Sequence, residues 1–300
     1  MNFLSLPKRL FRLILWTNRN GLINLYYRSL NGKSFEIQVN DEYPVAFSSI
    51  TDSELFASFP SLCGSAANDV EIFKKFRSSK VMIQALDHVS FDLGKAYIDE
   101  ILKFRPWSYN FTSVIEHIDS VGRPSKFKFS PFGTFSPTLL RYLKVYVDLE
   151  KCFGSLKYLN IAEIGVGFGG QGSLIGLIET PLSYTYFDIP PVLELARKFT
   201  RELEIPGTFS FMDGRNPNPL NTDLVISNYA FSELNRSVQD QYLTKVILPA
   251  PRGYITWNSL SATCLGGYSL AELIRIIPNS QILPEIPNTG DHNAIIVWGI

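Results

Sequence analysis

The sequence is poor in the residues that most often mark a metal or redox site. Its 300 residues include three cysteines, three histidines and three methionines. Cys63, Cys152 and Cys264 are isolated and odd in number, which favours reduced thiols in a cytoplasmic protein over a disulfide framework. No Asp, Glu, His or Cys residues have the spacing of metal ligands, so we expect no catalytic metal.

Net charge is absent too, since 28 Lys and Arg balance 28 Asp and Glu. No basic stretch is interleaved with aromatic residues, so we expect no nucleic-acid partner. The opening basic and apolar stretch, residues 7–16, is too short to cross a bilayer. It predicts a surface helix, either docked on its own domain or in peripheral contact with an anionic membrane.

The hydrophobic pattern changes near residue 155. Before it, helical spacing is clear over residues 91–104 and 138–154, and residues 120–137 are rich in turn residues. After it, short apolar runs alternate with helical patterns. These runs are 158–165, 183–189, 208–212, 223–229, 253–258, 280–284 and 294–299. We therefore expect a mainly helical substrate or cap region over residues 1–155 and an α/β domain over 156–300.

The last two strands should differ from the rest. Only residues 285–293 separate them, which is short for a parallel crossover and sufficient for an antiparallel connection. The sequence thus predicts a Rossmann-like sheet that is mostly parallel and ends in an antiparallel hairpin.

A glycine-rich loop follows the first predicted strand of the α/β domain. The segment EIGVGFGGQG, from Glu163 to Gly172, contains the spacing Gly165-x-Gly167-x-x-Gly170. Such glycines let a backbone approach a ligand closely at the carboxyl edge of a parallel sheet. Asp188, at the end of the second strand, is placed to accept hydrogen bonds from a ribose diol. A nicotinamide dinucleotide and S-adenosylmethionine both fit this pattern.

Three features favour S-adenosylmethionine. Glu163 precedes the glycines and can orient the loop or meet an ammonium group, Asp213 ends the third strand near an adenine amino group, and the hairpin is not expected of a dehydrogenase. The other cofactor contacts that we expect lie in the loop and at the strand ends. They are Gly169, Gly170, Gln171, Ile189, Gly214, Asn228 and Tyr229.

Several segments together resemble the sugar O-methyltransferase family of bacterial surface-polysaccharide gene clusters, within the class I S-adenosylmethionine-dependent fold. The similar segments begin near Gly122 and include SPTLLRY, EIGVGFGGQ, YFDIPPVLELA, DLVISNYAFSEL, GYITWN and DHNAIIVWG. Where the family pattern has a second glycine after Gly165, this chain has Val166. The resemblance implies methylation of a sugar hydroxyl during O-antigen or capsule synthesis. The acceptor would be a sugar, a nucleotide sugar or a lipid-linked glycan, met in the cytoplasm or at the inner membrane.

The chemistry requires a base for the hydroxyl proton, and two residues at the expected rim qualify. His292 precedes the last strand, and Glu233 follows the fourth. The resemblance implies that Arg141 and Tyr142 face the active site as acceptor contacts. Arg123 and Arg141 would suit an acceptor that carries phosphate, because arginine binds phosphate through charge-assisted hydrogen bonds. C-methylation of a keto sugar, an NAD-dependent oxidoreductase and a non-catalytic cofactor-binding subunit remain as alternatives.

Overall fold

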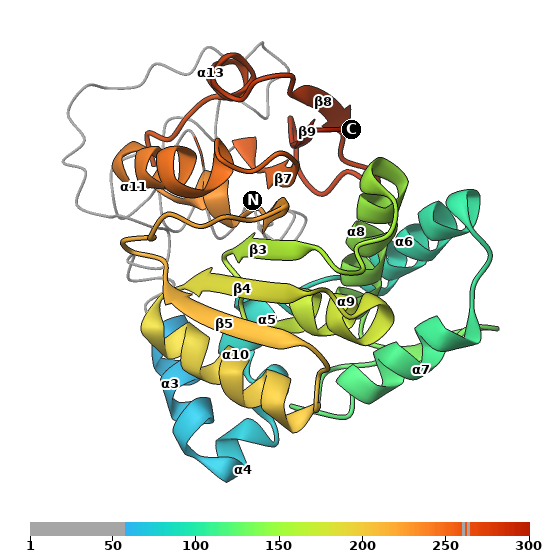
Figure 1. Ribbon diagram of the computed structural model, residues 1–300. Helices are drawn as coiled ribbons and strands as arrows, with labels where there is room; N and C mark the ends of the chain where they lie inside the picture. Colours follow the sequence, from blue (N-terminus) through green and yellow to red (C-terminus); the bar gives the residue numbers. More distant parts are fainter. Residues whose placement is uncertain (1–57, 260–261, 263–264) are drawn as a thin grey trace, which may run out of the picture.

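The computed structural model describes residues 58–259, 262 and 265–300, so the prediction over residues 7–16 lies outside them, as does Cys264. Its centre is a seven-stranded sheet in the order β5-β4-β3-β6-β7-β9-β8 (Figure 1). The strands are β3 (Asn160–Ile164), β4 (Ser183–Asp188), β5 (Thr208–Asp213), β6 (Leu224–Asn228), β7 (Gly253–Trp257), β8 (Gln281–Pro284) and β9 (Ala294–Trp298). Each falls in one of the predicted apolar runs, β5 extending one residue beyond its run.

The strand directions confirm the predicted fold class. Strands β3 to β7 pair in parallel, whereas β9 is antiparallel to both β7 and β8. The chain winds outward from β3 to β5 and then returns to β6 on the other side of β3. The strand order therefore reverses between β3 and β6, and in open α/β sheets ligands bind outside the carboxyl ends at such a point.

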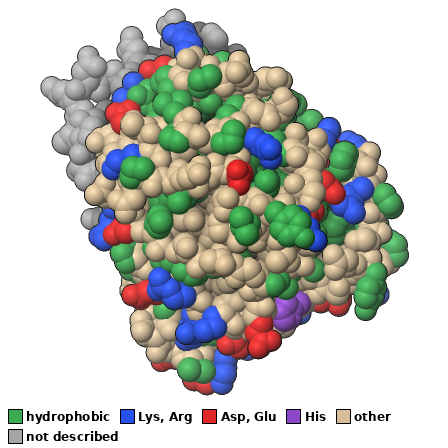
Figure 2. Space-filling model, viewed as in Figure 1, with side chains coloured by type: hydrophobic (Ala, Val, Ile, Leu, Met, Phe, Trp, Pro, Cys, Tyr) green, Lys and Arg blue, Asp and Glu red, His purple; other side chains and the backbone are tan. Residues whose placement is uncertain are grey.

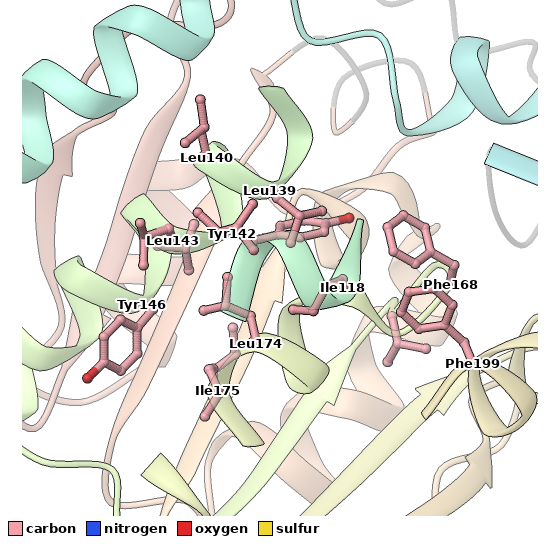
Figure 3. Packing of buried hydrophobic residues seen from close by; sticks show 14 of the residues in the cluster. Ile118, Leu139, Leu140, Tyr142, Leu143, Tyr146, Phe168, Leu174, Ile175 and Phe199 are labelled. Carbon is pink, nitrogen blue, oxygen red and sulfur yellow. The ribbon is translucent and has the colours of Figure 1, made fainter. Parts of the chain in front are cut away.

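Helices cover both faces of the sheet (Figure 1). On one side lie α8 (Pro137–Phe153), α9 (Gly170–Glu179) and α10 (Pro190–Glu202). On the other lie α11 (Arg236–Tyr242), its π-helical continuation η5 (Leu243–Ile247), and α13 (Leu270–Ile276). Because side chains alternate along a strand, Ile161 of β3 enters the first core, and Ala162 and Ile164 enter the second. Figure 3 shows the first core, where leucines of α8 and α9 meet.

The described part of the first region is mainly helical and packs against that first face. It contains α3 (Ser58–Asn68), α4 (Val70–Phe73), η3 (Phe76–Ser78), α5 (Lys80–Ala85), α6 (Phe91–Phe104) and α7 (Tyr109–Ile118), then a hairpin of β1 (Phe127–Phe129) and β2 (Gly133–Phe135). Helix α3 packs on α10, α6 on α8, and α7 on α9. One hydrophobic core thus contains residues of both regions, from Phe59 to Val297.

A buried ion-pair network fastens this region to the glycine loop. The fully buried Arg77 donates to Asp119 at 2.9 Å, to Asp87 at 3.1 Å and to Ser136 Oγ at 3.0 Å. Its guanidinium also lies 4.7 Å from the ring centroid of Phe168, which belongs to the glycine loop. The N-terminal helices are therefore part of the frame that shapes this loop.

The surface carries charges of both signs. In the face shown in Figure 2, Lys and Arg side chains are interspersed with Asp and Glu side chains. Across residues 58–259, 262 and 265–300, no helix combines the length and the apolar character that a membrane span requires.

Candidate functional site

The glycine loop lies at the switch point of the sheet, between the end of β3 and the start of α9. Gly165, Gly167 and Gly169 have positive φ angles of 76°, 56° and 86°. A Cβ at Gly165 would lie 1.9 Å from Ala230 Cβ, and one at Gly167 would lie 2.6 Å from Leu86 Cδ1. The positive φ angles favour glycine at both positions, and at Gly165 the short approach to Ala230 leaves no room for a side chain.

The start of α9 has no side-chain cap. Gly169 is its N-cap residue. The N–H groups of a first helical turn have no partner within the helix, and together with the helix dipole they favour a negative group. Gly170 is packed tightly, since a Cβ there would lie 2.6 Å from the rings of Phe168 and Tyr142.

Asp188 joins the end of β4 to this loop. Its Oδ2 accepts hydrogen bonds from Val166 N at 2.8 Å and from Gly167 N at 3.3 Å, and its Oδ1 accepts one from Ile189 N at 2.8 Å. Burial raises the pKa of Asp188 to about 6, against the opposing effect of these backbone donors. A carboxylate has acceptor capacity for further donors, so Asp188 fits the ribose diol that the sequence assigned to it.

Glu163 lies beneath the loop, facing the layer of α8, α9 and α10. Its Oε2 accepts a hydrogen bond from the hydroxyl of Tyr184 at 2.9 Å, and both side chains are buried. Burial raises the pKa of Glu163 to about 8. This arrangement is in keeping with the expected role of supporting the loop.

Asp213 and Gly214 lie at the neighbouring end of β5. The exposed Asp213 carboxylate pairs with Arg215, which holds its pKa below the usual value. Gly214 N donates to Asp188 O at 2.8 Å, so the ends of β4 and β5 are joined at the same rim. The structure thus brings the predicted ribose and adenine contacts together.

A second group of predicted residues meets where α8, α9 and β6 converge. Gln171 Nε2 donates to Tyr142 O at 3.1 Å, and Asn228 Nδ2 lies 3.5 Å from Gln171 Oε1. The guanidinium of Arg141 lies 5.4 Å from the ring centroid of Tyr142 and 5.9 Å from that of Tyr229. Arg141 and Tyr142 are buried, so this group is internal rather than part of an open surface.

Arg123 differs from this buried group in its exposure to solvent. It is exposed, with a φ angle of 53°, in the turn between α7 and the β1–β2 hairpin. The two arginines that the sequence assigned together to the acceptor therefore occupy different environments, one on the surface and one in the interior.

Both candidate bases lie in connections at the carboxyl edge of the parallel strands. Ala294 pairs with Trp257 at the carboxyl end of β7, so the exposed His292 precedes β9 at that edge, as expected. Glu233 ends the short 3-10 helix η4 (Ala230–Glu233) that follows β6, and it is half-buried.

A cluster around the carboxylate of Glu285 was not predicted from the sequence. This buried carboxylate accepts hydrogen bonds from the hydroxyl of Tyr229, from Thr289 N at 3.0 Å and from Asn293 Nδ2 at 3.1 Å. Tyr229 itself has a φ angle of 70°, which is unusual for an aromatic residue. The cluster fixes the loop that carries His292, and the polar segment IPNTGDHN between β8 and β9 is its one sequence signal.

No family model matches the chain, and no curated protein matches its sequence. Among solved structures, the magnesium protoporphyrin IX methyltransferase of Synechocystis PCC 6803 with bound SAM is similar at 14% identity over 65% of this chain and 99% of that one, with a TM-score of 0.41. A SAM-dependent methyltransferase from Aquifex aeolicus is similar at 16% identity over 50% of this chain and 86% of that one, with a TM-score of 0.37. The strand order and register of the sheet, rather than these similarities, carry the fold assignment.

Proposed function

We propose that the chain binds S-adenosylmethionine and transfers its methyl group to a hydroxyl of a sugar acceptor. The observation that carries this proposal is the bond between Asp188 and the glycine loop at the switch point of the sheet. It supports the proposal because a carboxylate that could accept from a ribose lies beside a positive-φ loop over which the rest of the cofactor could pass.

The residues present fit this cofactor. Asp188 would hold the ribose hydroxyls, and the rim formed by Asp213 and Gly214 would meet the adenine. When bound, the cofactor supplies a methyl group made electrophilic by the adjacent sulfonium. The chain must then place the acceptor oxygen in line with that methyl and remove the hydroxyl proton.

His292 is the base that we propose, with Glu233 as the competing candidate. Histidine takes up a proton near neutral pH, as a general base must. The Glu285 cluster supports this role because it fixes the loop before β9 on the edge of the sheet. Proton transfer from the sugar hydroxyl to His292 would leave an oxygen nucleophile beside the methyl group.

We further propose that the acceptor carries phosphate, as a nucleotide sugar or a lipid-linked glycan of surface-polysaccharide synthesis does. Arg123 is exposed and precedes the basic hairpin residues Lys126 and Lys128, which are exposed as well. Charge-assisted hydrogen bonds from such residues favour phosphate. A cytoplasmic location, with contact at the inner membrane, would bring the protein to this substrate.

The test is calorimetric titration of the full chain with S-adenosylmethionine and with NAD⁺, followed by transfer of labelled methyl to a panel of free and phosphorylated sugars. We expect binding of S-adenosylmethionine alone and faster transfer to the phosphorylated acceptors. An Arg123→Met variant should raise the acceptor KM and leave cofactor affinity unchanged. NAD⁺ binding without S-adenosylmethionine binding would refute the function, and binding without transfer to any acceptor would favour a non-catalytic subunit. Equal rates on free and phosphorylated sugars would refute the acceptor class.

A further inference from the structure

Arg141 is a buried cation among uncharged groups. Its side chain is 9% exposed, and within the described ranges it makes no ion pair. Nη2 donates to Leu86 O at 3.5 Å, the limit of a hydrogen bond, and Nε has no partner in the described part of the chain. A buried charge without a counter-charge is costly. Arg141 therefore indicates an anionic group that arrives with a ligand.

The start of α9 adds donors at the same place. Gln171, in the first turn of α9, donates from Nε2 to the carbonyl oxygen of Tyr142, the residue that follows Arg141. This contact holds the uncapped end of α9 against the turn of α8 that carries the guanidinium. Backbone N–H groups and a guanidinium together form a site for a carboxylate.

A buried acceptor lies beside these donors. Among the described residues Asn228 Oδ1 has no hydrogen-bond partner, while its Nδ2 is held 3.5 Å from Gln171 Oε1. A buried carbonyl oxygen without a donor favours a ligand that supplies one, such as an ammonium group. Gln171 thus joins donors for an anion to an acceptor for a cation. This combination matches the carboxylate and the ammonium of an α-amino acid.

We propose that Arg141 and the start of α9 bind the carboxylate of the methionine portion of S-adenosylmethionine, and that Asn228 binds its ammonium. This inference rests on the proposed function and moves Arg141 from the acceptor to the cofactor. The position is consistent, because Asp188 ends β4 and Asn228 ends β6, on opposite sides of β3. Two strand spacings, about 10 Å, separate them, and the methionine chain would cross the glycine loop between them.

The experiment compares two ligands that differ only in the carboxylate. S-adenosylmethionine and decarboxylated S-adenosylmethionine are titrated calorimetrically into the full-length wild type and into Arg141→Met, Arg141→Lys and Arg123→Met. We expect Arg141→Met to weaken S-adenosylmethionine about 10- to 100-fold, as the loss of charge-assisted hydrogen bonds predicts. The decarboxylated ligand should bind both proteins equally. Arg141→Lys should restore part of the difference, and Arg123→Met should change neither affinity.

A second variant tests the ammonium contact. Asn228→Leu should weaken both ligands by the same factor, because both keep the ammonium, and should leave 5′-methylthioadenosine, which lacks the whole amino acid, unaffected. Thermal unfolding of each variant shows that it is folded.

The outcomes separate this inference from the proposed function. If the wild type binds neither ligand nor methylthioadenosine, the cofactor assignment itself fails. If the wild type binds S-adenosylmethionine and Arg141→Met binds it equally well, Arg141 does not hold the cofactor and this inference is overturned while the function stands. Equal weakening of both ligands by Arg141→Met overturns it too, since the residue would then act on the shape of the pocket.

Discussion

We expect the affinity for S-adenosylmethionine to rise with pH between about 5 and about 7, the range around the raised pKa of Asp188. The ribose hydroxyls must donate to the ionised carboxylate, so proton uptake by Asp188 competes with the cofactor. The sign follows from linkage. A ligand that favours the ionised carboxylate binds tightly at pH values above the pKa of the free protein and weakly at pH values below it.

The magnitude follows from the same pKa. With a pKa of about 6, roughly nine-tenths of the Asp188 carboxyls are ionised at about pH 7 and roughly a tenth at about pH 5. The dissociation constant should therefore increase about tenfold as the pH falls across this range. The cofactor keeps its own carboxylate and ammonium charges between these limits.

Neighbouring titratable groups do not account for the expected change of the dissociation constant with pH. The thiol of Cys63 and the phenol of Tyr242 have pKa values raised by burial. The pKa of Glu163 is raised to about 8, and Arg215 lowers that of Asp213. None of these groups changes its charge substantially near pH 6.

Calorimetric titration at four or so pH values, in buffers of equal ionic strength, measures the effect. Asp188→Asn is the matched variant, since an amide of the same shape cannot ionise. It should bind about 10- to 100-fold more weakly near pH 7 and show no dependence on pH. As a control at the same edge of the sheet, the series is repeated in His292→Gln. A dissociation constant that stays flat in the wild type, or a slope that persists in Asp188→Asn, refutes the reasoning.

Three further perturbations test the framework of the site. His292→Gln should lower turnover by about 10²–10⁴ without changing cofactor affinity, measured by methyl transfer and calorimetry; unchanged turnover excludes this base. Gly167→Ala should destabilise the fold by about 1–3 kcal/mol in urea unfolding, because φ is 56° and Leu86 Cδ1 lies in the way, and a Leu86→Ala change in the same chain should recover part of the loss. Arg77→Met should cost about 3–5 kcal/mol in the same assay, since it leaves the buried Asp119 without its ionic partner, and a loss under about 1 kcal/mol contradicts that account.

Several elements and contacts could not be predicted from the sequence. The helices α3, α4, α5 and α7 were not predicted individually. For α4 and α5 the reason is length, since helices of four and six residues are too short to show a helical period. The hairpin of β1 and β2 was hidden in the turn-rich stretch over residues 120–137, since three-residue strands carry almost no alternation. The contact of Leu86 with Gly167 joins residues that nothing in the local pattern relates.

The sequence by itself determined the strands, their alternation with helices, the antiparallel end of the sheet, and the position of the glycine loop and Asp188 at one edge. These follow from local rules: side-chain periodicity, connection length and the conformational freedom of glycine. Only the tertiary structure decided that Arg123 is exposed, that Arg141 is buried with no counter-charge among the described residues, and that Glu285 holds Tyr229. The reason is physical, because burial and pairing depend on which distant segments exclude water from a side chain, and charge patterns along the chain do not carry that information.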